Sequence, residues 1–153
     1  MAAMVGLMKH VDRELCTAVE EALRRYDPLR HSGSPITVIS HDGTVELTGV
    51  VPSQAIKLVA ADLARRVPGV REVRNHLISD TEIEIQAAQA LAQDDRTRLA
   101  SNPILVRSML GVLYLRGTVA SPEAKAAVTE IVRGIEGVRE VVNQIEILGE
   151  TSA

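Results

Sequence analysis

The sequence predicts an α+β protein of two tandem αββαβ units, each a small three-stranded mixed sheet with two helices on one face. Three observations support this prediction. The phrase GVREVRN at 69–75 returns as GVREVVN at 137–143. The same offset of 68 residues aligns prolines, glycines, serines and apolar positions along the chain without a gap. Within each copy, the apolar spacing changes between the helical and the strand period.

The repeat sets the expected domain boundaries. Residues 12–79 form the first unit and residues 80–148 the second. An N-terminal segment at 1–11 and a C-terminal tail at 149–153 lie outside the repeat.

Each unit is expected to open with a helix. Apolar residues recur at helical spacing in both copies: Leu15, Val19, Ala22, Leu23 and Tyr26, then Ile83, Ala87, Ala90 and Leu91. Pro28 and Gly33 are expected to end the first of these helices, because proline and glycine commonly follow a helix.

A hairpin is expected next. Asp42-Gly43 is a strong signal for a two-residue turn, since a type I′ turn needs positive φ at both central positions. The flanking strands are PITVIS and TVELTGVV in the first copy, and PILVRS and VLYLRGTV in the second. The second copy keeps only Gly111 at the turn.

A second helix and a closing strand complete each unit. Ser53 and Ser121 are expected N-caps, and Pro122 suits the first helical position. Gly69 and Gly137 are expected to stop these helices in the left-handed conformation. The closing strands read VREVRNHLI and VREVVNQIEI.

The composition excludes several classes of function. The chain has no Phe and no Trp, so few side chains could stack on bases, and its net charge of −3 comes from well-mixed acids and bases. We therefore expect no nucleic-acid partner. The N-terminal MAAMVGLMKH lacks the positive start of a signal peptide, and no stretch is long and apolar enough to span a membrane. A cytoplasmic location is the expectation.

The ordered motifs resemble the BON domain, a family named after bacterial osmotically induced and nodulation-type proteins. They are Ile36-Thr37-Val38, Gly43, 45–51 and 69–75, with counterparts at 104–106, 111, 113–119 and 137–143. The resemblance implies an αββαβ fold, often in tandem, and no agreed catalytic residues. It also implies binding of phospholipid or other envelope components, often under osmotic or envelope stress.

Four repeated polar residues are the candidate ligand-binding residues. Asn75 and Asn143 would point inward from the closing strand, where each amide needs partners, either within the fold or from a ligand. Arg71 and Arg139 each precede a glutamate, and these pairs suit an exposed charge pattern, with ligand contact as the alternative.

No catalytic, metal or cofactor site is predicted. His10, His31, His41 and His76 lack metal-ligand spacing, so surface histidines are favoured over a metal or pH site. Cys16 is the only cysteine, which excludes an internal disulfide, and its apolar setting favours an inert thiol over a reactive one.

The sheet face away from the helices differs between the copies. Alternation places mostly polar side chains on this face of the first sheet and many apolar ones on the second. We predict an interface there, against the first unit or another copy of the protein, formed by Leu105, Met109, Val112, Tyr114, Val142 and Leu148.

The leading hypothesis for function is a non-enzymatic tandem binding module, with a phospholipid membrane surface or an envelope-linked partner implied by the resemblance. Arg65, Arg66, Arg71 and Arg74 are the nearest approach to a patch for anionic headgroups. The alternatives are a small-ligand or ion sensor with a site in the cleft between the repeats, and an oligomerising adaptor.

Overall fold

Each half of the chain folds into its own α+β unit, which confirms the predicted fold class. The computed structural model describes residues 2–97 and 103–149, with side chains from residue 12 onward. The chain divides into two compact units, Met1–Ser79 and Asp80–Ala153.

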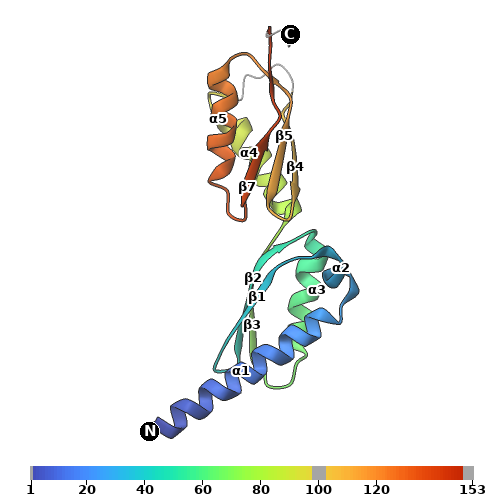
Figure 1. Cartoon of the computed structure of the whole chain (residues 1–153), viewed down its shortest axis with the longest axis vertical. Helices are drawn as coiled ribbons and strands as arrows, with labels where there is room; N and C mark the ends of the chain where they lie inside the picture. Colours follow the sequence, from blue (N-terminus) through green and yellow to red (C-terminus); the bar gives the residue numbers. More distant parts are fainter. Residues whose placement is uncertain (1, 98–102, 150–153) are drawn as a thin grey trace. The chain divides into compact units, whose positions relative to one another are not determined.

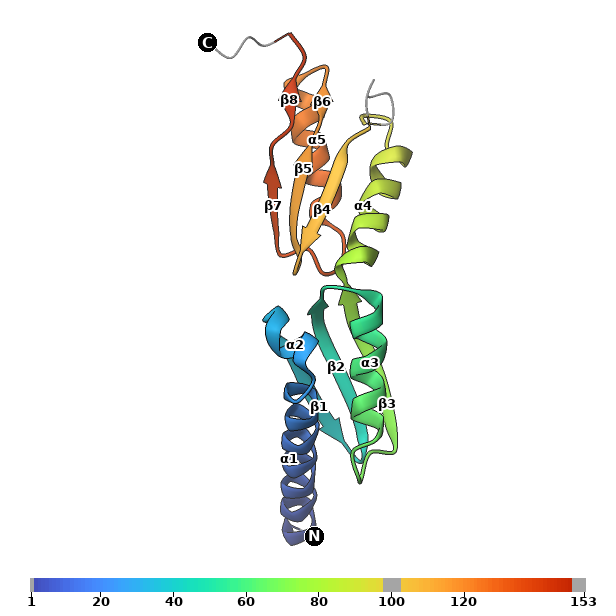
Figure 2. The same cartoon turned by 90° about the vertical axis from the view of Figure 1, so that its right-hand side faces the viewer.

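The first unit is a three-stranded mixed sheet with helices on one side (Figure 1). The strands lie in the order β1, β2, β3, with β1 and β2 antiparallel and β2 and β3 parallel (Figure 2). Its elements are α1 (Ala2–Arg24), α2 (Asp27–Ser32), β1 (Ile36–His41), β2 (Thr44–Val51), α3 (Gln54–Arg65) and β3 (Glu72–Ser79).

The expectation that Pro28 ends the first helix is wrong. Helix α1 ends at Arg24, and Pro28 lies in the first turn of the additional short helix α2. A proline in the first turn lacks only an N–H that has no intrahelical partner, so it favours the start of a helix there. Gly33, at φ 69°, ends α2 instead.

The second unit repeats this order, with strands β4, β5 and β7 in one sheet and the pair β6 and β8 beside it. Helices α3 and α5 have the serine caps that the sequence predicts, because Ser53 accepts from the N–H of Ile56 and Ser121 from that of Ala124. The elements are α4 (Asp80–Gln93), β4 (Leu105–Met109), β5 (Val112–Arg116), β6 (Thr118–Val119), α5 (Pro122–Arg133), β7 (Glu140–Asn143) and β8 (Glu146–Ile147).

The closing strand of the second unit is interrupted, whereas the sequence predicts one continuous strand. Strand β7 ends at Asn143 and β8 begins at Glu146. Backbone bonds still cross the gap, since the N–H groups of Gln144 and Glu146 donate to the carbonyls of Leu115 and Gly117 at 2.9 Å each.

Each unit has its own aliphatic core between sheet and helices. The predicted helical stripes supply many of the buried residues. In the first unit the cluster contains Leu15, Val19, Leu23, Leu29, Val45, Leu47, Val51, Ala60, Ala64 and Leu77. In the second unit the buried apolar residues are Ile83, Ala87, Leu91, Leu113, Leu115, Val119, Ala127, Val128, Val132 and Ile145.

Both hairpins turn with two residues at positive φ. Asp42 and Gly43 have φ of 50° and 82°, which confirms the predicted turn. Leu110 and Gly111 have φ of 49° and 86°, so the second copy makes the same turn without the Asp-Gly signal. A leucine in this conformation is strained, because its Cβ crowds the following carbonyl.

The helix that opens each unit also reaches the edge strand of its sheet. The carboxylate of Glu84 on α4 accepts from the N–H of Ser108 on β4 at 3.0 Å. The thiol of Cys16 holds the equivalent position on α1, 3.7 Å from the carbonyl oxygen of Val38 on β1.

Candidate functional site

Asn75 ties the closing strand of the first unit to helix α3. Its Nδ2 donates to the carbonyl oxygen of Lys57 at 3.0 Å, and its Oδ1 accepts from the N–H of Leu77 at 3.2 Å. These bonds are the partners within the fold that a half-buried amide requires. The ligand-binding role of Asn75 stays a prediction.

Asn143 makes the same two contacts in the second unit and one more. Its Nδ2 donates to the carbonyl of Lys125 at 2.9 Å and to the hydroxyl of Thr129 at 2.7 Å. Its Oδ1 accepts from the N–H of Ile145 at 3.0 Å. The repeated asparagine therefore ties the closing strand to the helix before it in each unit, and ligand contact at Asn143 also stays a prediction.

Arg71 and Arg139 join the closing strand to the tip of the hairpin. Their backbone N–H groups donate to the carbonyls of Gly43 and Gly111, at 2.8 Å in each unit. Both residues are exposed. The third residue of the repeated phrase therefore anchors the hairpin through its backbone N–H. The ligand role of the two guanidinium groups stays a prediction.

The buried carboxylate of Asp80 holds the strained turn of the second unit. It accepts from the hydroxyl of Ser108 at 2.7 Å and from the N–H groups of Leu110 and Gly111 at 2.8 and 3.1 Å. Asp80 is only 6% exposed. In the sequence, this role was indicated only by the alignment of Asp12 with Asp80 in the repeat. Sequence spacing alone does not show that Asp80 contacts the turn.

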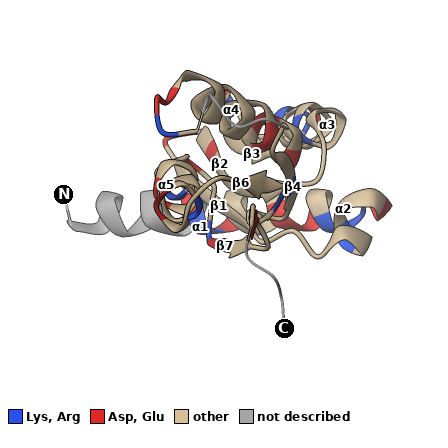
Figure 3. Cartoon of the chain, turned by 90° about the horizontal axis from the view of Figure 1, so that it is seen from above, with Lys and Arg blue, Asp and Glu red and all other residues tan. Residues whose placement is uncertain are grey.

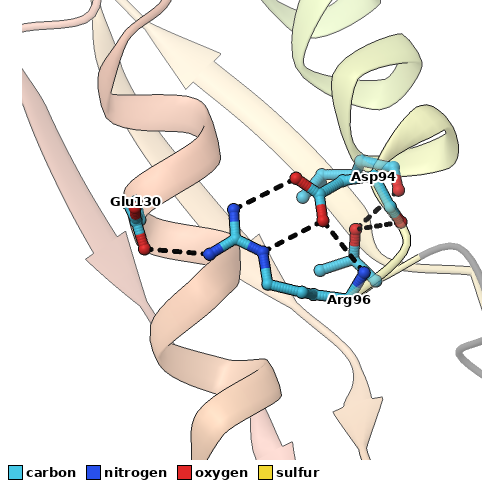
Figure 4. Close-up of polar contacts among 5 residues, drawn as sticks. Asp94, Arg96 and Glu130 are labelled. Atoms are coloured by element: carbon cyan, nitrogen blue, oxygen red, sulfur yellow. Dashed lines mark hydrogen bonds and ion pairs between the residues drawn. The ribbon is translucent and has the colours of Figure 1, made fainter.

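An ion-pair network connects the end of α4 to α5. Arg96 lies between Asp94 and Glu130 (Figure 4), with nitrogen–oxygen distances of 3.1 and 3.0 Å. Hydrogen bonds from Arg96 hold the pKa of Asp94 below its ordinary value, and both carboxylates raise the pKa of Arg96. Such exposed pairs contribute modestly to stability.

His41 and His76 both lie on the outer face of the first sheet but are not neighbours. Strand β2 separates them, because His41 pairs with Thr44 and His76 with Thr48. In the ranges 2–97 and 103–149, no group of three or more His, Cys, Asp or Glu residues is placed to hold a metal ion. His10 has no described side chain.

Cys16 has the environment of an unreactive thiol. Its side chain is half-buried, and burial raises its pKa above the ordinary value. A raised pKa lowers the thiolate fraction at neutral pH, and the thiolate is the reactive form.

The outer face of the second sheet is an uncovered apolar surface within its unit. Leu105, Met109 and Leu148 are 66%, 62% and 64% exposed, whereas Val112, Tyr114 and Val142 are half-buried. All six predicted interface residues therefore have accessible area, and their role in an interface stays a prediction. We call this surface, formed by the outward side chains of β4, β5 and β7, the second outer face.

Cross-strand register orders the second outer face into three rows. Starting from the hairpin tip, they are Met109–Val112–Glu140, Arg107–Tyr114–Val142 and Leu105–Arg116–Gln144, the last closed by a hydrogen bond from Arg116 Nε to Gln144 Oε1 of 3.1 Å. A depression of about 430 Å³ lies over the second and third rows. Its lining comprises Leu105, Val106, Arg107, Met109, Tyr114, Arg116 and Gln144.

The first sheet carries different residues in the same rows. They are His41–Thr44–Glu72, Ile39–Glu46–Arg74 and Thr37–Thr48–His76. Glu46 lies 3.6 Å from Arg74, so opposite charges meet on this face, and 4.0 Å from the imidazole of His76. The depression here, about 420 Å³, has Asp42 and Glu46 among its lining residues.

Charge elsewhere is mixed over the described helices. Figure 3 shows Lys and Arg among Asp and Glu on α2 and α5, for example. The predicted basic group is partly neutralised, since Arg66 pairs with Asp62 at 2.9 Å and Arg74 with Glu46. None of the helices in the described ranges is long and apolar enough to cross a membrane.

Comparison with known proteins gives a family match over both units. The model of the BON domain matches residues 11–78 and again 79–149. The chain is 29% identical over 148 residues to the outer membrane lipoprotein DolP of Haemophilus influenzae, covering 90% of this chain and 75% of that protein.

Two further similarities are more distant. An uncharacterized protein from the gshII 5′ region of Anaplasma centrale is 27% identical over 124 residues, which covers 74% of this chain and 82% of that protein. The C-terminal domain of CdsD, a structural protein of the type III secretion system of Chlamydia trachomatis, superposes with a TM-score of 0.40 at 13% identity, covering 88% of this chain and 97% of that domain.

Proposed function

Because the chain belongs to the BON domain family, with one domain in each unit, we propose that it is a non-enzymatic binding module for a phospholipid membrane surface, active under envelope stress. The name of its relative DolP, an outer membrane lipoprotein, supports a membrane-linked role. The second outer face is the single structural observation that carries the proposal.

The second outer face suits a partner with apolar area. Leu105 and Met109 are each more than 60% exposed on one strand, with the half-buried ring of Tyr114 beside them. Exposed apolar area of this kind usually marks an interaction site. Within the described strands of the first sheet, Ile39, at 49%, is the only large apolar residue that is exposed.

The repeated polar residues support a non-enzymatic module. Asn75, Asn143 and Asp80 all use their polar atoms in hydrogen bonds that order strands and turns. A catalytic group would instead be aimed at a site where substrate could bind.

Vesicle flotation tests the proposal. The protein is mixed at low salt with vesicles of 30% phosphatidylglycerol in phosphatidylcholine, and we expect it to rise with the lipid. Leu105→Glu/Met109→Glu should abolish flotation, because it places two carboxylates on the apolar face. Ile39→Glu on the first sheet is the matched control and should float. Failure of the wild-type protein to float would refute the proposal.

An oligomerising adaptor is the second candidate, because a second copy could cover the same exposed face. Light scattering of the wild type and of Val112→Glu/Tyr114→Glu distinguishes it. An oligomer that the double substitution converts to a monomer would favour the adaptor over the membrane module.

Two earlier expectations remain predictions. Thermal-shift screening against ions and nucleotides would check the sensor with a site between the repeats, since a ligand that binds only the folded state raises Tm. Cell fractionation would check the expected cytoplasmic location against a membrane-linked one.

A further inference from the structure

Building on the proposed binding function, we propose that the second outer face binds a single-chain anionic amphiphile of the fatty-acid class. The carboxylate would lie between Arg107 and Arg116, and the hydrocarbon chain would run over Tyr114 toward Val112 and Met109.

Two arginines of adjacent rows can reach one anion. Arg107 pairs across the strands with Tyr114, and Arg116 follows Tyr114 by two residues on β5. Such diagonal neighbours on one face lie about 7–8 Å apart, within reach of long side chains. Arginine binds carboxylates through two parallel N–H donors, so a shared carboxylate would suit this pair.

Both guanidinium groups retain donors for a ligand. Arg116 uses its Nε on Gln144 and keeps its terminal nitrogens. Arg107 has no ion-pair partner among the described residues, and none of the residues that line the depression is acidic. The lining therefore carries two positive charges that nothing in it neutralises.

Most of the apolar area lies toward the hairpin tip, although Leu105 lies beside Arg116 in the third row. Met109, Val112, Tyr114 and Val142 form a continuous group over the first and second rows, toward the hairpin tip. The depression of about 430 Å³ is within the usual range of about 300–1,000 Å³ for small-molecule sites. A hydrocarbon chain would cover exposed side chains such as Met109.

The remaining charge on the face favours one orientation of the ligand. Glu140 lies in the first row, beside Val112 and at the other end of the face from Arg116. It would repel a carboxylate there and leave the hydrocarbon end unaffected. A second exposed carboxylate, Glu146, follows Gln144 by two residues and lies beyond the third row. The head would therefore lie between the two carboxylates, at Arg107 and Arg116, with the chain toward the tip.

The first sheet supplies an internal comparison. Its residues at the positions of Arg107 and Arg116 are Ile39 and Thr48, and Glu46 replaces Tyr114. That face has no arginine pair for a carboxylate, and Glu46 would oppose one. We expect no binding there.

A second copy is a poorer occupant on grounds of charge. Two second outer faces packed against each other would enclose Arg107 and Arg116 from both chains, with Glu140 as the acidic residue in the three rows. Burying charges without close partners is costly. An amphiphile brings the missing negative charge with it.

Titration calorimetry with monomeric dodecanoate tests the inference on the full chain. We expect saturable binding at one site per chain, below the concentration at which dodecanoate aggregates. Uncharged dodecyl maltoside should bind at least tenfold more weakly. Arg107→Gln and Arg116→Gln should each weaken binding about tenfold, since a charged hydrogen bond is worth roughly that factor.

Control variants separate the site from general charge effects. Arg24→Gln/Arg30→Gln removes two exposed arginines of the first unit and should leave affinity unchanged. Met109→Gln should weaken binding, whereas Ile39→Gln should not. Circular dichroism of every variant confirms that the fold is intact.

The possible outcomes are distinct from those for the proposed function. Flotation on vesicles without binding of monomeric dodecanoate would overturn the amphiphile site and leave the membrane module standing. Binding of dodecanoate without flotation would support the site and refute the membrane module. Equal affinity for dodecyl maltoside, or an oligomer that Met109→Gln disrupts, would also overturn the inference, the last in favour of a second copy.

Discussion

Replacing Asp80 with alanine should destabilise the second unit far more than Asp12→Ala destabilises the first. Asp80 accepts three hydrogen bonds of 2.7 to 3.1 Å at the hairpin, two of them from the N–H groups of Leu110 and Gly111. Asp12, at the same place in the repeat, makes a bond of 3.5 Å from Ser40. Both substitutions remove a carboxylate from the same position of the repeat.

The magnitude follows from the donors left behind. Two backbone N–H groups, the buried one of Gly111 and the part-buried one of Leu110, lose a charged acceptor, at about 1–3 kcal/mol each. Leu110, at φ 49°, also loses contacts that hold it in a conformation costing about 1–2 kcal/mol. The hydroxyl of Ser108 can rotate to another partner, so its lost bond adds no cost to the free energy of unfolding. We expect Asp80→Ala to cost about 3–5 kcal/mol and Asp12→Ala about 1 kcal/mol or less.

The chain provides a fluorescent reporter for each unit. Tyr26 and Tyr114 are its only tyrosines and there is no tryptophan, so Tyr26→Phe leaves Tyr114 to report on the second unit alone. The complementary Tyr114→Phe background reports on the first unit. Urea unfolding followed by tyrosine fluorescence then gives a midpoint and slope for each unit.

Equal losses in the two units would refute this reasoning, as would a loss below about 1 kcal/mol for Asp80→Ala. Asp80→Asn serves as a control for shape, because it keeps one acceptor oxygen and should cost less than alanine.

Three further predictions concern single positions. Gly49→Ala should destabilise the fold more than Gly117→Ala does. Both glycines have positive φ, but a Cβ on Gly49 would collide with a backbone carbonyl, whereas a Cβ on Gly117 would have its nearest neighbour 3.4 Å away. Equal Tm values for the two variants would contradict this prediction. Arg96→Gln should lower Tm at pH 7, and this difference in Tm should fade as the pH drops below 3.8. The pKa of Asp94 is lowered in the folded chain, so its carboxylate loses its charge only below that pH. A difference in Tm that persists at low pH would exclude a contribution from the ion pair. Cys16 should be alkylated by iodoacetamide slowly in the native chain and rapidly in urea, and similar rates would show that burial does not protect it.

The sequence predicted the repeating architecture because its determinants are local. The serine caps of α3 and α5, the apolar stripes and the Asp42-Gly43 turn each depend on residues near in sequence. The prediction at Pro28 failed because proline is common both after the end of a helix and in the first turn of the next one. The turn at Leu110 gave no signal of its own, because it depends on a carboxylate 30 residues away.

The candidate site was predicted only in outline. Alternation identified Leu105, Met109 and Tyr114 as outward-facing without any knowledge of strand order. Alternation could not predict that Arg107 and Arg116 lie in adjacent rows, because the rows depend on the register between strands. Asn75 and Asn143 were predicted to need partners, and the carbonyls of Lys57 and Lys125 supply them through contacts that the sequence does not reveal.

The contact between α4 and the edge of β4 bears on aggregation. Glu84 occupies the N–H of Ser108, a donor that would otherwise be open to a strand from another molecule. On β1 the thiol of Cys16 lies at the equivalent place and is a weaker hydrogen-bonding group. Uncovered edges recruit other chains. Partial opening of α4 would therefore expose the N–H of Ser108 to intermolecular strand pairing.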